Sequence, residues 1–398
     1  MFKISLNYPI NTSFLSEALY EGLLFITLNT QITKISPSHI EIGDLRDAIK
    51  SLNDMRLSNM RVQFVENDYS ERKRNKPINK LLEILGLGNI TIRRNYGSLL
   101  LTLKSNLNRL NFKETININI KPGQQLLIDL KRKDEGIALP QIFKIDRYTG
   151  FSSLETKLML KQVTAYVSKE VALILILGLH SSFIARVVQQ VGRGRRNEIY
   201  YFLMFSPEEI IKLLSLGSKS PVLIRNLFLI KDLAKDVLEK IVSKTSLNEA
   251  LAVELSLNLR IREALRNYNL EKVSFILFKV ALEGRTYKIY EQTPITIYRI
   301  PPFIRILGKF SRDPESIARR IAWVLRPGGE VLRALGDPDS DEHGDVVEAV
   351  IGLYRFVVLG DPAGWYLFTR KLMDAHNVAL RRKTYNNEYV KLLSNLTF

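Results

Sequence analysis

The segment that decides the first part of the fold is Thr115-Ile116-Asn117-Ile118-Asn119-Ile120, a strict alternation of polar and apolar side chains. A period of two is typical of a β-strand with one buried face and one face in water. Pro122-Gly123 follows and is typical of a turn towards residues 125–130, so we expect a β-hairpin. The chain therefore contains a strand whose polar side chains remain in contact with solvent.

Residues 1–152 around this hairpin show mainly the patterns of strands and loops. We expect shorter strands at 98–104 and 141–146 and helices at 44–53 and 77–85. This combination predicts a mixed α/β N-terminal domain over residues 1–152.

Longer stretches of apolar periodicity begin near Ser153, and they are accompanied by helix start signals. Ser206-Pro207-Glu208-Glu209 combines a capping serine, a proline at the first helical position and acidic residues near the helix dipole. Further helix starts are expected at Ser246 with Glu249, at Asp313-Pro314 and at Asp361-Pro362. These signals predict a mostly helical middle region over residues 153–300.

A C-terminal helical bundle is expected over residues 301–398. A short extended segment at 295–300 precedes Pro301-Pro302, a double proline that suits a hinge between the middle region and the bundle. The predicted fold class is therefore α+β.

Net charge is the most informative property of the composition. The chain has 58 Lys and Arg against 41 Asp and Glu, a formal charge of +17. A field of this size attracts polyanions, and separated basic clusters suit a long ligand that is touched at many points. We expect nucleic-acid contacts at four groups: Arg72, Lys73, Arg74 and Lys76; Lys131, Arg132 and Lys133; Arg193, Arg195 and Arg196; and Arg285, Lys288 and Arg299.

Two of these groups have additional features. Residues 189–196, which end in the Gly-Arg-Gly-Arg-Arg run 192–196, resemble the arginine-finger motif of two-lobed helicases. The chain lacks the Gly-rich phosphate loop that such motors require, so the cluster is either a grip on backbone phosphates or a solvated loop. The last group is interleaved with Tyr287, Tyr290 and Tyr298, an arrangement that favours stacking on bases.

Residue types that support catalysis are scarce. The absence of cysteine excludes disulfides, cysteine nucleophiles and cysteine-ligated metals, and the four histidines show no pair at a ligand spacing. No Gly-x-Ser-x-Gly elbow is present. We therefore expect no enzyme activity, no cofactor and no metal site.

One acidic segment offers an alternative. Carboxylates at 337, 339, 341, 345 and 348 follow the spacing of a calcium loop, but Pro338 and Glu342 occupy places where that loop needs other residues. We expect a solvated loop in which Asp345 caps the next helix. The alternative is a metal-dependent nuclease that uses the carboxylates of residues 337–348, with His343 nearby.

No signal peptide is evident, and the most apolar run, residues 171–179, is too short to cross a bilayer. We therefore expect a cytoplasmic protein without a membrane partner.

The chain as a whole resembles the large subunit of the archaeal type I-A CRISPR interference complex, Cascade. The resemblance rests on an α+β first half, a helical second half, strong positive charge and the absence of nucleotide or metal motifs, and residues 2–24 and 352–377 contribute most. It implies a non-catalytic subunit that binds crRNA and target DNA, contributes to protospacer-adjacent-motif recognition and admits a separate helicase–nuclease. The implied partners are crRNA, target DNA, the other subunits of the complex and that effector. A basic scaffold for an acidic protein remains another hypothesis.

Overall fold

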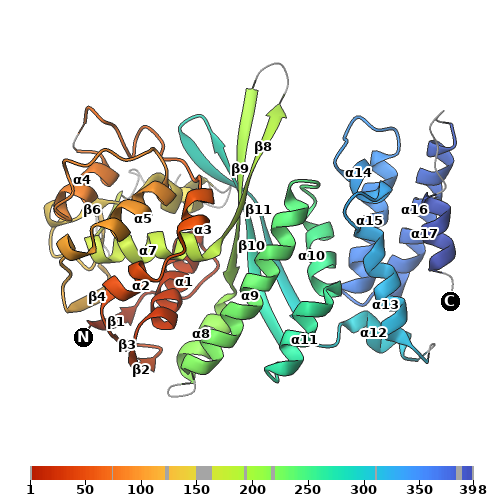
Figure 1. The fold of residues 1–398 in the computed structure, drawn as a ribbon, viewed down its shortest axis with the longest axis horizontal. Helices are drawn as coiled ribbons and strands as arrows, with labels where there is room; N and C mark the ends of the chain where they lie inside the picture. Colours follow the sequence, from red (N-terminus) through yellow and green to blue (C-terminus); the bar gives the residue numbers. More distant parts are fainter. Residues whose placement is uncertain are drawn as a thin grey trace. The chain divides into compact units, whose positions relative to one another are not determined.

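The computed structural model describes residues 2–73, 75–121, 125–148, 164–191, 195–216, 220–309, 312–381 and 388–396. The chain forms two compact units. Unit 1 contains Met1–Asn226 and Phe275–Pro294, and unit 2 contains Leu227–Ser274 and Ile295–Phe398. The predicted boundary after residue 152 lies outside the described residues, and the one after residue 300 lies close to Ile295, where the chain enters unit 2 for the last time. The mixture of sheets and helices confirms the α+β class (Figure 1).

Unit 1 is built around a seven-stranded sheet with the order β2-β3-β1-β4-β5-β7-β6. The strands are β1 (Phe2–Asn7), β2 (Ile32–Ser36), β3 (His39–Ile42), β4 (Thr115–Lys121), β5 (Gln125–Ile128), β6 (Ile137–Ala138) and β7 (Thr164–Val167). The alternating segment forms β4, and its antiparallel pairing with β5 confirms the predicted hairpin. On its other side β4 pairs in parallel with β1.

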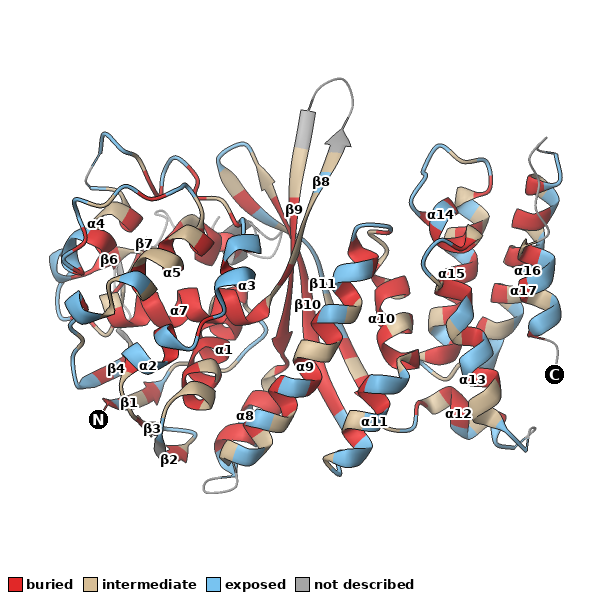
Figure 2. Cartoon of the chain, viewed as in Figure 1, coloured by how far each residue is buried: buried red, intermediate tan, exposed pale blue. Residues whose placement is uncertain are grey.

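Two buried helices form the core of unit 1, namely α1 (Phe14–Asn29) and α7 (Lys169–Ser182). Helix α7 contains the apolar run 171–179 and contacts β4 and β7 (Figure 2). Gly22 and Gly178 allow the two helices to approach closely, because a Cβ on either would lie 1.9 Å from a carbonyl oxygen of the other helix. No helix among the described residues is long and apolar enough to cross a membrane.

Among its described residues, the N-terminal part of unit 1 has four more helices: α2 (Leu45–Lys50), α3 (Asp54–Asn59), α4 (Pro77–Ile84) and α5 (Tyr96–Ser105). Helices α2 and α4 confirm the predictions at 44–53 and 77–85. The predicted strand at 98–104 is wrong, because this segment lies in α5. Its leucines are buried at 99, 100 and 103, a helical spacing that a short apolar run conceals.

Three short 3-10 helices lie in the same region: η1 (Leu107–Arg109), η2 (Lys133–Glu135) and η3 (Gln141–Tyr148). The predicted strand at 141–146 is also wrong, because this segment forms η3. The Asp68 carboxylate accepts hydrogen bonds of 2.9 and 3.1 Å from the backbone N–H of Gln141 at its start. A partner 73 residues away thus fixes the first turn.

Besides its helices, the middle region contains a second sheet that the sequence patterns did not predict. Its order is β11-β10-β9-β8, with β8 (Phe183–Val191), β9 (Arg195–Phe205), β10 (Lys272–Glu283) and β11 (Thr286–Tyr298). The predicted extended segment at 295–300 is the end of the long strand β11. Strand β10 is buried at nine consecutive positions. Strands buried on both faces lose the alternation that identifies them in a sequence.

Besides α7, the described residues of the middle region form the helices α8 (Pro207–Ser215), α9 (Ser220–Val242), α10 (Asn248–Leu257) and α11 (Leu259–Asn267). A C-terminal helical group follows in unit 2, as predicted: α12 (Pro302–Leu307), α13 (Pro314–Ala322), η5 (Trp323–Leu325), α14 (Glu330–Leu335), α15 (His343–Val357), α16 (Pro362–Ala379) and α17 (Glu388–Asn395). Helices α15 and α16 approach through Gly352 and Gly364.

The helix start signals were largely correct. Ser206, Asp313 and Asp361 each accept a backbone hydrogen bond in the first turn of α8, α13 and α16. The predicted cap at Ser246 is wrong, because the N-cap of α10 is Leu247 and makes no side-chain cap hydrogen bond. Asp345 lies inside α15 and does not cap it.

Candidate nucleic-acid interface

The polar face of the unit 1 sheet is a surface assembled from four strands. Register places polar residues of β2, β3, β1 and β4 in rows, because partnered residues project from the same face of a sheet. One row is Lys34, Glu41, Lys3 and Thr115; the next is Ser36, His39, Ser5 and Asn117; and Asn7 pairs with Asn119. We call these residues the sheet face.

The sheet face is in contact with solvent because the opposite face holds the core. Ile4, Ile40, Ile116 and Ile118 have no exposed surface. Lys3, Asn7, Lys34, Thr115 and Asn117 are exposed, and the other members are partly buried. The solvent-exposed face predicted for the strand at 115–120 is therefore part of a broader polar surface formed by four strands.

The charge of the sheet face is mainly positive. Glu41 is bound by His39, whose Nε2 lies 3.0 Å from Oε1. That hydrogen bond lowers the pKa of Glu41, and the neighbouring Lys3 and Lys34 lower it further. Glu41 lies between Lys3 and Lys34 in the row, so the two lysines share one carboxylate and leave an excess of positive charge. This excess of positive charge can attract an anion from solution.

A pocket of about 510 Å³ lies at the β4 side of the sheet face. It is lined by Lys113, Thr115, Asn117 and Asn119 from β4 and the segment before it, and by Asp129, Leu130, Lys131 and Glu135 from the segment after β5. Asp129 Oδ1 accepts a hydrogen bond of 2.9 Å from the backbone N–H of Asn117 and so joins the two segments. Lys131, a residue predicted to touch nucleic acid, thus lies beside the sheet face.

Tyr166 extends the same surface with an aromatic ring. Leu127 of β5 pairs with Lys121 of β4 on one side and with Tyr166 of β7 on the other, so Tyr166 belongs to the face that carries Asn119. Tyr166 is partly exposed, whereas its neighbours in β7, Ala165 and Val167, are buried.

The predicted arginine cluster lies at the end of the β8–β9 hairpin. Arg195 is the first residue of β9 and pairs with Val191 of β8, while Arg193 lies outside the described residues. The pairing of β10 with β9 stops at Glu198. Beyond that point the hairpin consists of two strands, and in Figure 1 it extends past the end of the β10–β11 hairpin.

Arg186 of β8 and Glu198 and Tyr200 of β9 join the two strands of the hairpin where the pairing with β10 stops, and we call these residues the clamp. Arg186 of β8 donates hydrogen bonds of 3.0 and 2.5 Å to the Glu198 carboxylate, which also accepts one from the Tyr200 hydroxyl. This arrangement holds β8 and β9 together through side chains as well as backbone.

The remaining basic groups differ in their surroundings. Arg72 and Lys73 are exposed, Arg74 lies outside the described residues, and Lys76 occupies the N-cap position of α4. Arg132 binds Glu135 at 3.2 Å, whereas Lys133 is exposed.

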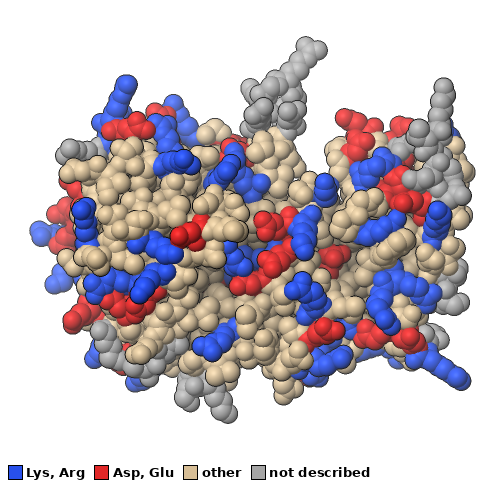
Figure 3. Space-filling model, in the orientation of Figure 1, with Lys and Arg blue, Asp and Glu red and all other residues tan. Residues whose placement is uncertain are grey.

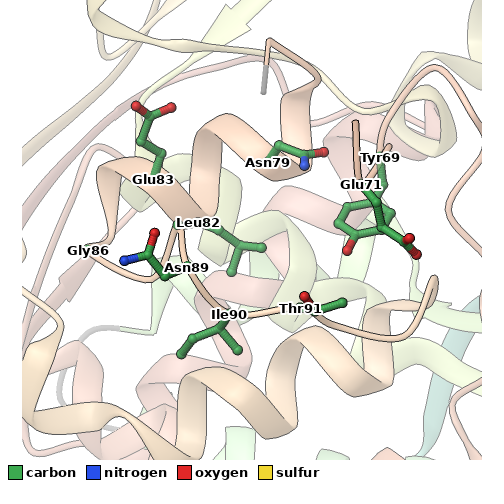
Figure 4. Close-up of a pocket in the computed structure, with 10 residues that line it drawn as sticks. Tyr69, Glu71, Asn79, Leu82, Glu83, Gly86, Asn89, Ile90 and Thr91 are labelled. Atoms are coloured by element: carbon green, nitrogen blue, oxygen red, sulfur yellow. The ribbon is translucent and has the colours of Figure 1, made fainter. Parts of the chain in front are cut away.

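A second pocket, of about 320 Å³, lies next to the first of these groups. Leu82 and Ile90 lie between two acidic residues, Glu71 and Glu83, at opposite sides of it (Figure 4). The Asn79 side chain is occupied by the backbone of Ser70, through hydrogen bonds of 3.1 and 2.9 Å. No lysine or arginine is among its lining residues, so it does not suit a phosphate.

The basic residues of β11 and its flanks are all paired with carboxylates. Arg285 binds Glu66 at 2.9 Å, Lys288 binds Glu283 at 2.5 Å, and Arg299 binds Glu271. Tyr287 is only 1% exposed and donates its hydroxyl hydrogen to the carbonyl of Gln63, so the predicted stacking on bases is wrong for this tyrosine.

The acidic segment 337–348 provides no metal centre among the described residues, which contain no group of three or more potential metal ligands. Lys371 occupies two of its carboxylates, at 3.0 Å from Asp345 and 2.9 Å from Glu348. Glu342 is buried and accepts a hydrogen bond of 2.8 Å from Arg333.

Lys and Arg side chains are interspersed with Asp and Glu on the face of the molecule shown in Figure 3.

Comparison with known proteins places the chain beside a protein of Archaeoglobus fulgidus that is described as uncharacterized. The two are 38% identical over 382 residues, which are 95% of this chain and 93% of the relative. The chain belongs to the same family as this archaeal protein. No family model and no solved structure was found to match the chain.

Sequence reasoning missed most of the sheet face. Lys3 and Lys34 are isolated lysines in the sequence, and only the strand order β2-β3-β1-β4 places them in one row. The alternation at 115–120 was the available signal, because it identified a strand with a solvent-exposed face.

Proposed function

We propose that this protein is a nucleic-acid-binding subunit without catalytic chemistry of its own, and that the sheet face is its principal binding surface. The observation that carries the proposal is the register that brings Lys3 and Lys34 into one row on either side of Glu41. Two exposed lysines that share one carboxylate retain positive charge for backbone phosphates, and a net charge of +17 adds a long-range field.

The polar residues of the sheet face suit the other parts of a nucleic acid. Asn7, Asn117 and Asn119 supply amide donors and acceptors for sugars and base edges. Tyr166 supplies a ring on which a base can stack, and this contact tolerates any sequence. Phosphate, sugar and base are thus each matched by a residue type on one continuous face.

The β8–β9 hairpin provides a second contact point in the same unit. Arg195 and Arg196 begin β9, Arg193 precedes them in the sequence, and arginines bind phosphate oxygens through two parallel hydrogen bonds. This hairpin therefore offers a second group of basic residues to a bound strand.

We propose that the protein acts in the setting that its resemblance to the Cascade large subunit implies. This setting is a cytoplasmic, crRNA-guided antiviral complex in which this chain is the large subunit. There it binds guide and target, contributes to protospacer-adjacent-motif recognition and recruits a helicase–nuclease. The strong positive charge, the α+β first part followed by helices, and the archaeal relative support this setting. Base pairing by a guide supplies sequence specificity, so the protein needs only backbone and short-motif contacts.

The direct test is binding by the purified full chain to single-stranded and duplex oligonucleotides, measured by fluorescence anisotropy. A triple variant, Lys3→Gln, Lys34→Gln and Lys131→Gln, is expected to lose more than ten-fold in affinity. The matched control is Lys244→Gln, Lys272→Gln and Lys309→Gln, three exposed lysines of unit 2. Equal losses in both variants, or binding to acidic protein without binding to nucleic acid, would contradict the proposal. Purification from the native host with sequencing of bound RNA tests the wider setting.

A further inference from the structure

We propose that the pocket beside the sheet face receives one unpaired nucleotide of a bound strand and favours guanine. This inference rests on the proposed function, since it names the chemical group that the binding surface recognises. The pocket, of about 510 Å³, has the size range of small-ligand sites in proteins.

The first observation is a buried carboxylate oxygen without a hydrogen-bond donor. The Asp129 side chain is only 7% exposed. Its Oδ1 accepts the Asn117 N–H, but no described residue donates a hydrogen bond to Oδ2, and the nearest cation, Lys113 Nζ, lies 4.0 Å away. A buried charged acceptor left without a donor is costly, so a ligand that brings an N–H group relieves that cost.

The second observation is another unpaired acceptor in the same pocket. The Asn119 side-chain oxygen is also buried without a hydrogen-bond partner among the described residues. A further carboxylate on the lining, that of Glu135, is already occupied by Arg132 at 3.2 Å. The pocket is therefore lined by two residues, Asp129 and Asn119, that each hold a buried acceptor without a donor among the described residues.

The third observation is the sign of the charge around these acceptors. Lys113 and Lys131, both exposed, line the same pocket. Two lysines disfavour a free cation or a polyamine, although such ligands would satisfy a carboxylate. A ligand that combines N–H donors with negative charge fits both features, and a nucleotide has this combination in its base and its phosphate.

The donor pattern separates guanine from the other bases, because adenine and cytosine present an amino group beside a ring nitrogen that only accepts. Guanine presents an imino and an amino group side by side on its Watson–Crick edge, whereas thymine and uracil present a single N–H between two carbonyl oxygens. Those carbonyls would face the oxygens of Asp129 and Asn119. Because this edge is occupied in a duplex, the base must be unpaired to enter.

The test uses competition anisotropy with oligothymidines of about ten nucleotides in which the central residue is thymidine, guanosine or inosine, made as DNA and as RNA. Inosine lacks the amino group of guanosine but keeps its shape. We expect the guanosine strand to bind about ten-fold more tightly than the all-thymidine strand, and the inosine strand to have an intermediate affinity. One hydrogen bond to a charged group changes an affinity by about this factor.

The variant Asp129→Asn removes one acceptor while keeping the shape of the side chain. Asp129 has a φ of 56°, a left-handed conformation that asparagine tolerates well, and the amide oxygen retains the bond to Asn117. We expect the guanosine preference to fall to two-fold or less. Asp134→Asn, at an exposed position outside the pocket lining, makes the same change of charge and should keep the preference.

The outcomes separate the two proposals. Binding of all strands without base preference, or a guanosine preference that survives Asp129→Asn, would overturn the pocket assignment alone. No binding of any strand would overturn the proposed function and this assignment with it. If Asp129→Asn does not fold, the ratio of guanosine to inosine binding by the wild-type protein still decides, because equal affinities contradict the assignment.

Discussion

The guanidinium of Arg186 binds the carboxylate of Glu198 through two hydrogen bonds, 3.0 Å from Nε and 2.5 Å from Nη2, and so joins β8 to β9. The Tyr200 hydroxyl donates to the same carboxylate. Burial acts to raise the pKa of Glu198, but the hydrogen bonds from Arg186 and Tyr200 outweigh it, so its pKa lies below the usual 4.5. The charged form of Glu198 therefore stabilises the folded hairpin.

The first prediction concerns this clamp. Because the folded pKa of Glu198 is lowered, its contribution to stability is complete above pH 4.5 and is lost as the pH falls through the folded pKa. Glu198→Gln is expected to lower the free energy of unfolding by about 1–2 kcal/mol at neutral pH. Urea denaturation between pH 7 and pH 3 should show this difference shrinking as the pH falls. A difference that stays constant would mean that the charge of Glu198 contributes nothing.

The second prediction concerns the contact of α1 with α7. A Cβ at position 178 would lie 1.9 Å from the carbonyl oxygen of Ala18, so Gly178→Ala must push the helices apart. We expect it to lower the free energy of unfolding by about 2–4 kcal/mol, as for other overpacked cores. Gly344→Ala in α15 is the control, because nothing lies within 4 Å of its Cβ position and alanine favours a helix. Similar effects at both positions would contradict the close approach.

The third prediction concerns the hairpin end. Replacing Arg193, Arg195 and Arg196 together with Glu is expected to weaken nucleic-acid binding by more than ten-fold and to leave the melting temperature almost unchanged. Charges at the end of a hairpin contribute little to folding. Lys244, Lys272 and Lys309 changed to Glu provide the same change of charge in unit 2. An unchanged affinity would mean that the arginines lie on a face that touches no ligand, and a large drop in melting temperature would make them structural.

The fourth prediction concerns the acidic segment. Asp337, Asp339 and Asp341 are exposed, so changing all three to Asn should leave stability unchanged and nucleic-acid binding equal or slightly stronger. The wild-type protein should show no magnesium-dependent cleavage of DNA or RNA and no ATP hydrolysis. Magnesium-dependent cleavage that disappears in the triple variant would contradict a non-catalytic role.

Local signals in the sequence predicted local structure well. The alternation at 115–120 identified β4, and the Ser206, Asp313 and Asp361 signals identified three helix starts with their caps. These succeed because a period of two and a capping side chain act between residues close in the chain. The second sheet was missed because β10 is buried on both faces and shows no alternation.

The candidate site could not be predicted in the same way, because it depends on contacts between distant segments. Lys3 and Lys34 become neighbours only through their pairing with Glu41 of β3. Asp129 belongs to no sequence motif. Only the structure shows that its Oδ1 accepts a hydrogen bond from Asn117 while its buried Oδ2 has no donor among the described residues. Conversely, Arg285, Lys288 and Arg299 looked free in the sequence, but each has a carboxylate partner in the structure.

The salt dependence of binding tests the central claim most directly. Each phosphate neutralised on duplex DNA contributes about 0.9 to the slope of log affinity against log salt concentration. If Lys3, Lys34 and Lys131 touch phosphates, changing them to Gln should reduce the magnitude of that slope by about 2 to 3 relative to wild type. The control variant in unit 2, with Lys244, Lys272 and Lys309 changed to Gln, should keep the wild-type slope. A sheet-face variant with the wild-type slope would contradict the sheet face as the nucleic-acid interface.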